Sequence, residues 1–144
     1  MEEHYLGKLF PALNYKNFRY FFYGQIVSLI GTWMQNIGQD WLVLELTNSA
    51  FYLGLITAMQ FLPTMLFSLL AGSIVDHFEK RKVLLFTQSI MAILALILAL
   101  ITYFEVVQIW HIIILALLLG IVRTVDMPAR HAFFSELVEK EHLV

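Results

Sequence analysis

Four long apolar stretches run through the sequence, separated by short polar or charged segments. They cover about residues 18–46, 50–75, 83–104 and 107–125. A helix needs about 20 predominantly apolar residues to cross a bilayer, so each stretch is long enough. Segments such as IMAILALILALI do not alternate with the period of two that a lipid-facing strand requires. The pattern therefore predicts an all-α polytopic membrane protein with four transmembrane helices.

The basic residues predict the orientation of these helices. All nine Lys and Arg residues lie before or at the start of the first stretch, between the second and third, or from the end of the fourth onwards. Four spans put all of these places on one side, and cytoplasmic loops collect Lys and Arg. We therefore expect residues 1–17 and 127–144 to be cytoplasmic. Apolar and charged positions mix after Pro128, which predicts an amphipathic helix along the cytoplasmic face.

Composition agrees with a membrane protein and gives no sign of an enzyme. The chain is 60% hydrophobic and 14% charged, whereas soluble domains have about 25% charged residues. A net charge of −2 and the absence of cysteine give no indication of nucleic-acid binding, disulfides or thiolate metal sites. We find no metal-ligand spacing, nucleophile motif or phosphate loop, so no catalytic residue, metal or cofactor is expected. The N-terminus lacks the basic region of a cleaved signal peptide.

The first helix has a polar face. At 100° per residue, its polar residues fall within about a third of the circumference. They are Gln25, Ser28, Thr32, Gln35, Asn36 and Gln39, with Asp40 at the edge of the sector. Gly24, Gly31 and Gly38 form a second stripe, which predicts a helix-packing seam.

This polar face has two interpretations. Hydrogen bonds between helices explain one or two amides, and a water-filled substrate pathway explains the whole set better. An Asp in mid-membrane costs about 2.5–3.5 kcal/mol and usually faces a cavity or a partner. Asp40 is therefore a candidate for proton coupling, with hydration at the outer surface as the alternative. Including the weaker stripe of the second helix, the candidate pathway residues are Gln25, Thr32, Asn36, Gln39, Gln60 and Thr64.

The charged segment GSIVDHFEKRKVLL, residues 72–85, resembles the signature between the second and third helices of the major facilitator superfamily. That signature reads Gly, three residues, Asp, a basic residue, any residue, Gly, and two basic residues. Gly72, Asp76, Lys80 and Arg81 match it, whereas His77 and Glu79 depart from it. The first helix and the segment VDMPARHAFFSELV resemble the branch that includes enterobactin exporters and related multidrug-type exporters.

The resemblance implies a twelve-helix transporter in two six-helix halves, with substrate bound between them near the midplane. This chain would then be an N-terminal fragment with the first four helices. Gly72, Asp76, Lys80 and Arg81 would form a cytoplasmic gate that is broken and remade as the halves rock. Arg123 is a candidate partner for Asp76 in that gate, and it is also spaced to pair with Asp126.

The expected function is proton-coupled export of a small amphipathic molecule or siderophore across the bacterial cytoplasmic (inner) membrane. Its expected partners are the lipid bilayer, the substrate, a proton, and the remaining transporter helices or a second copy. Two alternatives stay open. In the first, the chain is a complete four-helix transporter that acts as a dimer. In the second, it is a membrane protein that only assembles with a partner and transports nothing.

Overall fold

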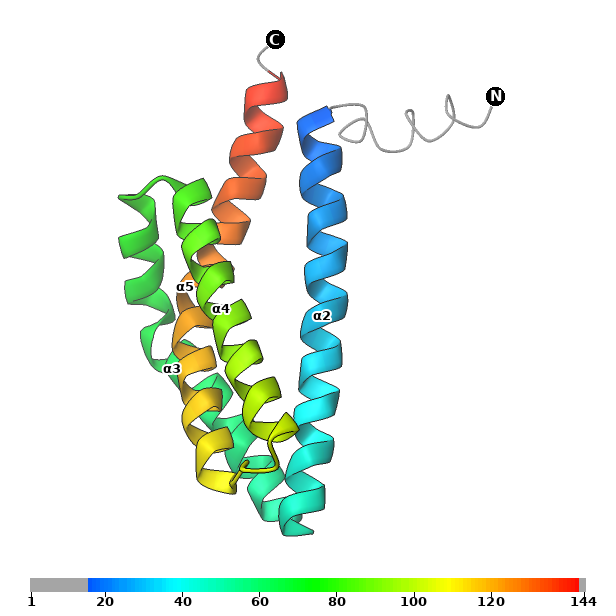
Figure 1. Ribbon diagram of the computed structural model, residues 1–144. Helices are drawn as coiled ribbons and strands as arrows, with labels where there is room; N and C mark the ends of the chain where they lie inside the picture. Colours follow the sequence, from blue (N-terminus) through cyan, green and yellow to red (C-terminus); the bar gives the residue numbers. More distant parts are fainter. Residues whose placement is uncertain (1–15, 143–144) are drawn as a thin grey trace.

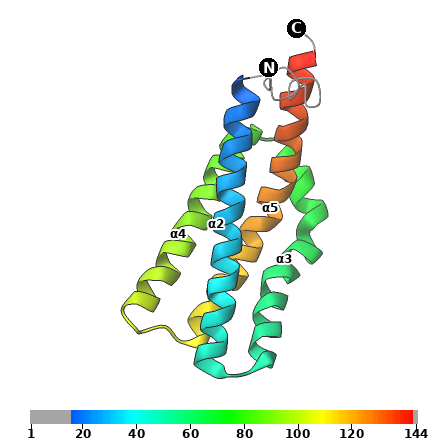
Figure 2. The same ribbon diagram turned by 90° about the vertical axis from the view of Figure 1, so that its right-hand side faces the viewer.

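The computed structural model describes residues 16–142, with side chains described for residues 19–20 and 22–136. This part of the chain forms four α-helices, and the expected all-α architecture is confirmed. They are α2 (Lys16–Thr47), α3 (Ala50–Asp76), α4 (Lys80–Tyr103) and α5 (Ile109–His142). The helices run alternately in opposite directions, so the start of α2, the α3–α4 turn and the end of α5 lie at one end of the bundle (Figures 1 and 2). Most of the expected N-terminal cytoplasmic segment lies outside the described residues.

Among the described helices, α3, α4 and α5 are long and apolar enough to cross a membrane. The remaining helix, α2, has 32 residues, which exceeds the length that a span needs, but its polar face lowers its hydropathy. A transmembrane position for α2 therefore depends on partners for its polar side chains inside the bundle.

The basic residues Lys80, Arg81 and Lys82 belong to a helix rather than to the α3–α4 turn. We expected the third helix to begin near Val83, but α4 begins at Lys80. Lys and Arg are good helix formers, so their charge does not delay the helix. The Glu79 carbonyl accepts the N–H groups of Lys82 and Val83 at 2.9 and 3.1 Å. The Glu79 carboxylate also lies 2.6 Å from Lys82 Nζ.

A single helix, α5, extends through the region where the sequence predicted a break after Val125 and a separate helix beyond Pro128. Proline removes one helical hydrogen bond, here the one that the Thr124 carbonyl would accept. Packing on both sides of the proline compensates for this loss, because Thr124 and Ala129 are both buried, at 4% and 0% exposed. The tail is thus a continuation of the fourth helix, and its side chains beyond residue 136 lie outside the described part.

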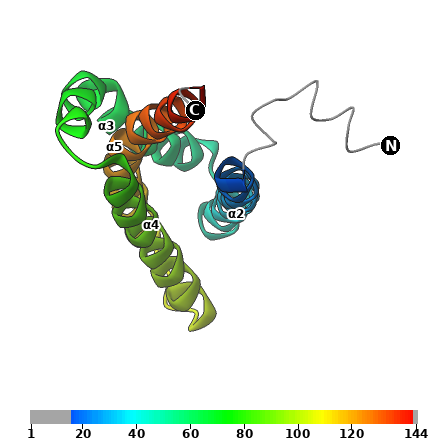
Figure 3. The same cartoon turned by 90° about the horizontal axis from the view of Figure 1, so that it is seen from above.

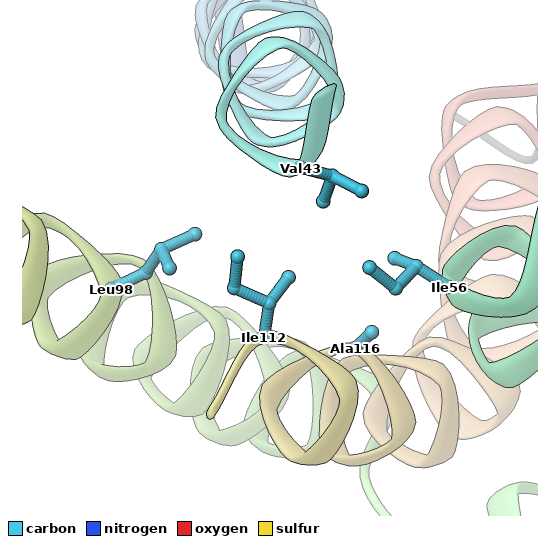
Figure 4. Packing of buried hydrophobic residues seen from close by; sticks show 5 residues of the cluster. All are labelled: Val43, Ile56, Leu98, Ile112 and Ala116. Atoms are coloured by element: carbon cyan, nitrogen blue, oxygen red, sulfur yellow. The ribbon is translucent and has the colours of Figure 1, made fainter. Parts of the chain in front are cut away.

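The centre of the bundle is α5. It packs most extensively against α3 and then against α4, whereas α2 makes few contacts with its neighbours. In the view along the bundle, α2 stands to one side of the other three helices (Figure 3). A buried apolar cluster near the α2–α3 turn joins all four helices (Figure 4). It consists of Val43, Ile56, Leu98, Ile112 and Ala116.

The tightest described glycine contact is at Gly120 of α5. A Cβ atom placed there would lie 2.5 Å from the Gln60 carbonyl oxygen and 3.0 Å from that of Met59. Real Cβ atoms do not approach a backbone oxygen so closely, so only glycine allows α5 to lie this near α3. The seam predicted on α2 is different, since nothing lies within 4 Å of a Cβ at Gly24, Gly31 or Gly38. No described helix packs on that stripe.

Replacing Gly120 by Ala should force α3 and α5 apart. We expect Gly120→Ala to lower the free energy of unfolding by about 1–3 kcal/mol, the usual range for overpacking. The matched control is Gly54→Ala on α3, where a Cβ atom meets nothing within 4 Å and where helix propensity favours Ala. Thermal unfolding of both variants in detergent measures the difference. Equal melting temperatures for the two variants would contradict the close contact.

Candidate functional site

Arg123 lies within the apolar helix α5 and is held by two other helices. Its Nη1 donates to Gln60 Oε1 of α3, and its Nη2 donates to Asn36 Oδ1 of α2, both at 3.2 Å. Both acceptors are neutral amide oxygens. A guanidinium in the membrane needs such partners because exposure to lipid is costly. Arg123 therefore joins α2, α3 and α5 near the middle of the bundle.

Asp126, on the same helix, is 4% exposed and accepts hydrogen bonds on both carboxylate oxygens. Its Oδ2 receives Arg130 Nη2 at 2.7 Å and Arg130 Nε at 3.2 Å. Its Oδ1 receives Thr87 Oγ1 at 2.6 Å and Gln88 Nε2 at 3.2 Å. Gln88 in turn accepts a hydrogen bond from Ser28 of α2 at 3.3 Å. This network joins α2 and α4 to α5.

The pairing of these charged groups differs from the one that sequence spacing suggested. We considered an ion pair between Arg123 and Asp126, but the structure pairs Asp126 with Arg130. The (i, i+4) spacing brings two side chains onto one face of a helix as readily as (i, i+3) does. Arg130 donates to Asp126 Oδ2 from both Nε and Nη2, while Arg123 donates to the amides of α2 and α3.

A cavity of about 320 Å³ lies between the helices beside these two groups. It is bordered by polar residues from α2, α3 and α5, and by Met91 of α4. The polar residues that matter here are Gln25, Ser28, Thr32, Gln60, Thr64 and Arg123. Thr64 also makes a hydroxyl–hydroxyl bond of 3.1 Å to Thr124. The cavity therefore combines apolar walls with a few polar groups, as small-molecule sites do.

The predicted pathway residues divide between two places. Gln25, Thr32, Gln60 and Thr64 border the 320 Å³ cavity, and Asn36 binds Arg123 on its wall. Gln39 instead borders a groove of about 530 Å³ between α2 and α4. Its side chain is 3% exposed, and its Nε2 has no hydrogen-bond partner among the described residues.

Asp40 is half-buried on α2. Its side chain has no hydrogen bond or ion pair to any described residue, and it borders neither the cavity nor the groove as described here. These contacts do not indicate a function for Asp40, so its role in proton coupling stays a prediction.

The expected gate residues lie at the end of the bundle that holds the α3–α4 turn. Lys80 Nζ donates to the Asp76 carbonyl at 3.1 Å and lies 3.8 Å from Glu136 Oε1 of α5. Arg81 and the Asp76 side chain are exposed, and a Cβ atom at Gly72 meets nothing within 4 Å. Arg123 is not part of this group, because its partner Gln60 lies roughly 24 Å along α3 from Asp76 at the helical rise per residue.

Sequence reasoning missed several members of the site. Thr87 and Gln88 lie in the first half of α4, ahead of an almost uniformly apolar run, and nothing in the local sequence marks them as partners of Asp126. Arg130 carried a usable signal, namely its spacing from Asp126. Among the described residues, no group of three or more His, Asp or Glu side chains could hold a metal ion.

Comparison with known proteins adds a family and two relatives. The family model described as transmembrane secretion effector matches residues 8–144. A staphyloferrin A transporter of Staphylococcus aureus is 36% identical over 123 residues, which make up 85% of this chain and 31% of that protein. A macrolide efflux protein A of Streptococcus pyogenes is 27% identical over 133 residues, which make up 90% of this chain and 33% of that protein.

The chain spans about a third of the length of these curated relatives. No solved structure matches it at a comparable level of significance.

Neutralising Asp126 should destabilise the bundle. Asp126→Asn keeps the shape of the side chain but leaves Arg130 without its counter-charge. We expect a loss of about 3 kcal/mol, the low end for a broken buried pair, because the Arg130 side chain remains 24% exposed. The control is Glu136→Gln, which removes the partner of Lys80 at 3.8 Å where Glu136 is 43% exposed. Such a pair contributes less than about 1 kcal/mol, so thermal unfolding that shows Glu136→Gln as the more damaging change would contradict the assignment.

Proposed function

Because the chain belongs to the transmembrane secretion effector family of the major facilitator superfamily, we propose that it contributes the first helices of a secondary-active exporter. Proteins of this family are transporters and not enzymes. Family membership and three helices of sufficient length and hydropathy indicate a multi-pass protein of the bacterial cell membrane. The proposed exporter moves a small amphipathic molecule or siderophore by alternating access. The names of the two relatives, a siderophore transporter and a drug-efflux protein, support this substrate range.

The observation that carries the proposal is the polar cavity inside an otherwise apolar bundle. Polar groups at this depth are expensive unless they face one another, water or a ligand. Asn36 and Gln60 are used by Arg123, whereas Gln25 borders open space. Interhelical hydrogen bonds alone do not account for a 320 Å³ space that several polar side chains border.

The proposed topology has four spans with both ends in the cytoplasm. Arg19, Arg130 and the basic residues at the start of α4 belong to segments at one end of the bundle (Figure 1). The turns at the opposite end, residues 48–49 and 104–108, contain neither Lys nor Arg. This distribution supports a cytoplasmic location for the α3–α4 turn. It also requires α2 to cross the membrane.

The cytoplasmic gate is proposed for Gly72, Asp76, Lys80 and Arg81. Lys80 supports it, since this residue bridges the end of α3 and the extension of α5. A contact between helix ends can be made in one state and broken in another, which is what a two-state element of a rocking motion requires. We assign Arg123 to the cavity wall rather than to the gate, because its partners lie in the middle of the bundle.

Binding of substrate in the cavity predicts protection of Thr32. These 144 residues contain no cysteine, so Thr32→Cys, in a transporter whose other cysteines are replaced, introduces a single thiol that borders the cavity. We expect ethidium or carboxyfluorescein, whichever the protein exports, to slow maleimide labelling about tenfold at about ten times its Kd. Ala50→Cys, an exposed position at the start of α3, is the control and should react at an unchanged rate. Equal labelling of Thr32→Cys with and without dye would contradict a pathway along α2 and favour a purely structural polar face.

Proton coupling through Asp40 predicts a specific defect. In proteoliposomes, Asp40→Asn should abolish the acceleration of dye export by an imposed pH gradient, while dye still equilibrates across the membrane. The reason is that an amide cannot bind and release the proton. Glu45→Gln, which alters an exposed carboxylate of the same helix, should retain the acceleration. Normal gradient-driven export by Asp40→Asn would exclude Asp40 as the coupling residue.

A further inference from the structure

The cavity has an unequal number of positive and negative groups on its walls. Arg123, Asp126 and Arg130 all border it. Asp126 forms an ion pair with Arg130, which donates two hydrogen bonds to one of the carboxylate oxygens. No carboxylate of the described residues lies within ion-pair distance of Arg123, and His131, which also borders the cavity, adds no negative charge. The walls therefore carry one uncompensated positive charge.

That charge is also only partly hydrogen-bonded. A guanidinium has five N–H donors in a planar fork, and Arg123 uses Nη1 and Nη2 once each, toward Gln60 and Asn36. These amides orient the fork without neutralising it. The remaining donors belong to a side chain that borders the cavity. Such a fork matches the two oxygens of a carboxylate.

We propose that the cavity binds an anionic group, a carboxylate or similar oxyanion of the substrate, at Arg123. The bound anion completes the hydrogen bonds of the guanidinium and brings the charge of the cavity walls to zero. A cationic substrate would meet a wall of its own sign and would be disfavoured. This substrate class rests on the proposed function, because the site is the same cavity.

Two variants compensate the charge of Arg123 while preserving the local geometry. Asn36→Asp has nearly the same shape as the native side chain, and its carboxylate takes the place of the Oδ1 that accepts from Arg123. The variant would thus supply an internal anion to Arg123, and it should fold at least as well as the native protein. Gln60→Glu does the same from α3. Gln35→Glu is the matched control, because it adds an acid to α2 next to Asn36 but borders the groove instead of the cavity.

The test measures dye binding to the transporter, expressed from its native gene and reconstituted in nanodiscs. Carboxyfluorescein is the anionic probe, ethidium the cationic probe, and citrate the competitor, all at constant ionic strength. We expect citrate-sensitive binding of carboxyfluorescein that weakens about tenfold to a hundredfold in Asn36→Asp and Gln60→Glu, the range for a lost charged hydrogen bond. Gln35→Glu should bind within about twofold of the native protein, a difference well below one such bond.

Unchanged carboxyfluorescein affinity in Asn36→Asp and Gln60→Glu, or binding of ethidium alone by the native protein, would overturn the proposal. Dye flux in proteoliposomes separates this result from a failure of the proposed function. Export of ethidium with no anion binding rejects the anion site and leaves the exporter intact. Carboxyfluorescein binding that weakens in Asn36→Asp and Gln60→Glu, without export of either dye, supports the anion site and rejects the exporter.

Discussion

The bundle depends on the two charged residues that α5 carries into the apolar interior. Neither Arg123 nor Asp126 can be left to lipid, because a charged side chain at mid-membrane costs about 2.5–3.5 kcal/mol on insertion scales. Their partners come from α2, α3 and α4, at Asn36, Gln60 and Thr87. The packing of α5 against α3, with Gly120 at the contact, places the acceptor Gln60 within reach of Arg123. The hydrogen bonds to the charged side chains and the packing of the helices therefore require the same relative positions of α3 and α5.

The same constraint explains why α2 belongs to the bundle although it touches its neighbours sparsely. Its apolar surface is largely exposed, with side chains such as Val27, Met34 and Trp41 each about 70% exposed. Its polar face supplies hydrogen bonds that a more apolar helix would lack: Ser28 donates to Gln88, and Asn36 accepts from Arg123. Outside the apolar cluster at Val43, α2 is joined to the other helices by hydrogen bonds from its polar face, and the cavity lies beside them. The structural role of the polar face and its proposed role in transport are therefore compatible.

The sequence predicted the parts of this structure that are local or periodic. Apolar length predicted the helices, and the 3.6-residue period of α2 predicted that Gln25 and Thr32 would share a face. What it could not predict depends on neighbours distant in the chain. The choice of Arg130 over Arg123 as the partner of Asp126 is decided by where α2 and α3 present their amides. The continuity of α5 through Pro128 was also hidden, because tertiary packing outweighs the hydrogen bond that proline removes. Gln39 shared the predicted stripe but borders a different space, since period alone does not say which helix faces which part of a stripe.

The central claim is that α2 crosses the membrane with its polar face turned inward. The most direct test labels single cysteines in intact cells with a membrane-impermeant maleimide, using Tyr20→Cys at the start of α2 and Ala50→Cys just beyond its end. A crossing helix predicts that the thiol at position 50 reacts from outside, whereas the thiol at position 20 reacts only after the cells are permeabilised. Reaction of both thiols in intact cells, or of neither, would mean that α2 does not span the bilayer, and the cavity described here would lose one of its walls.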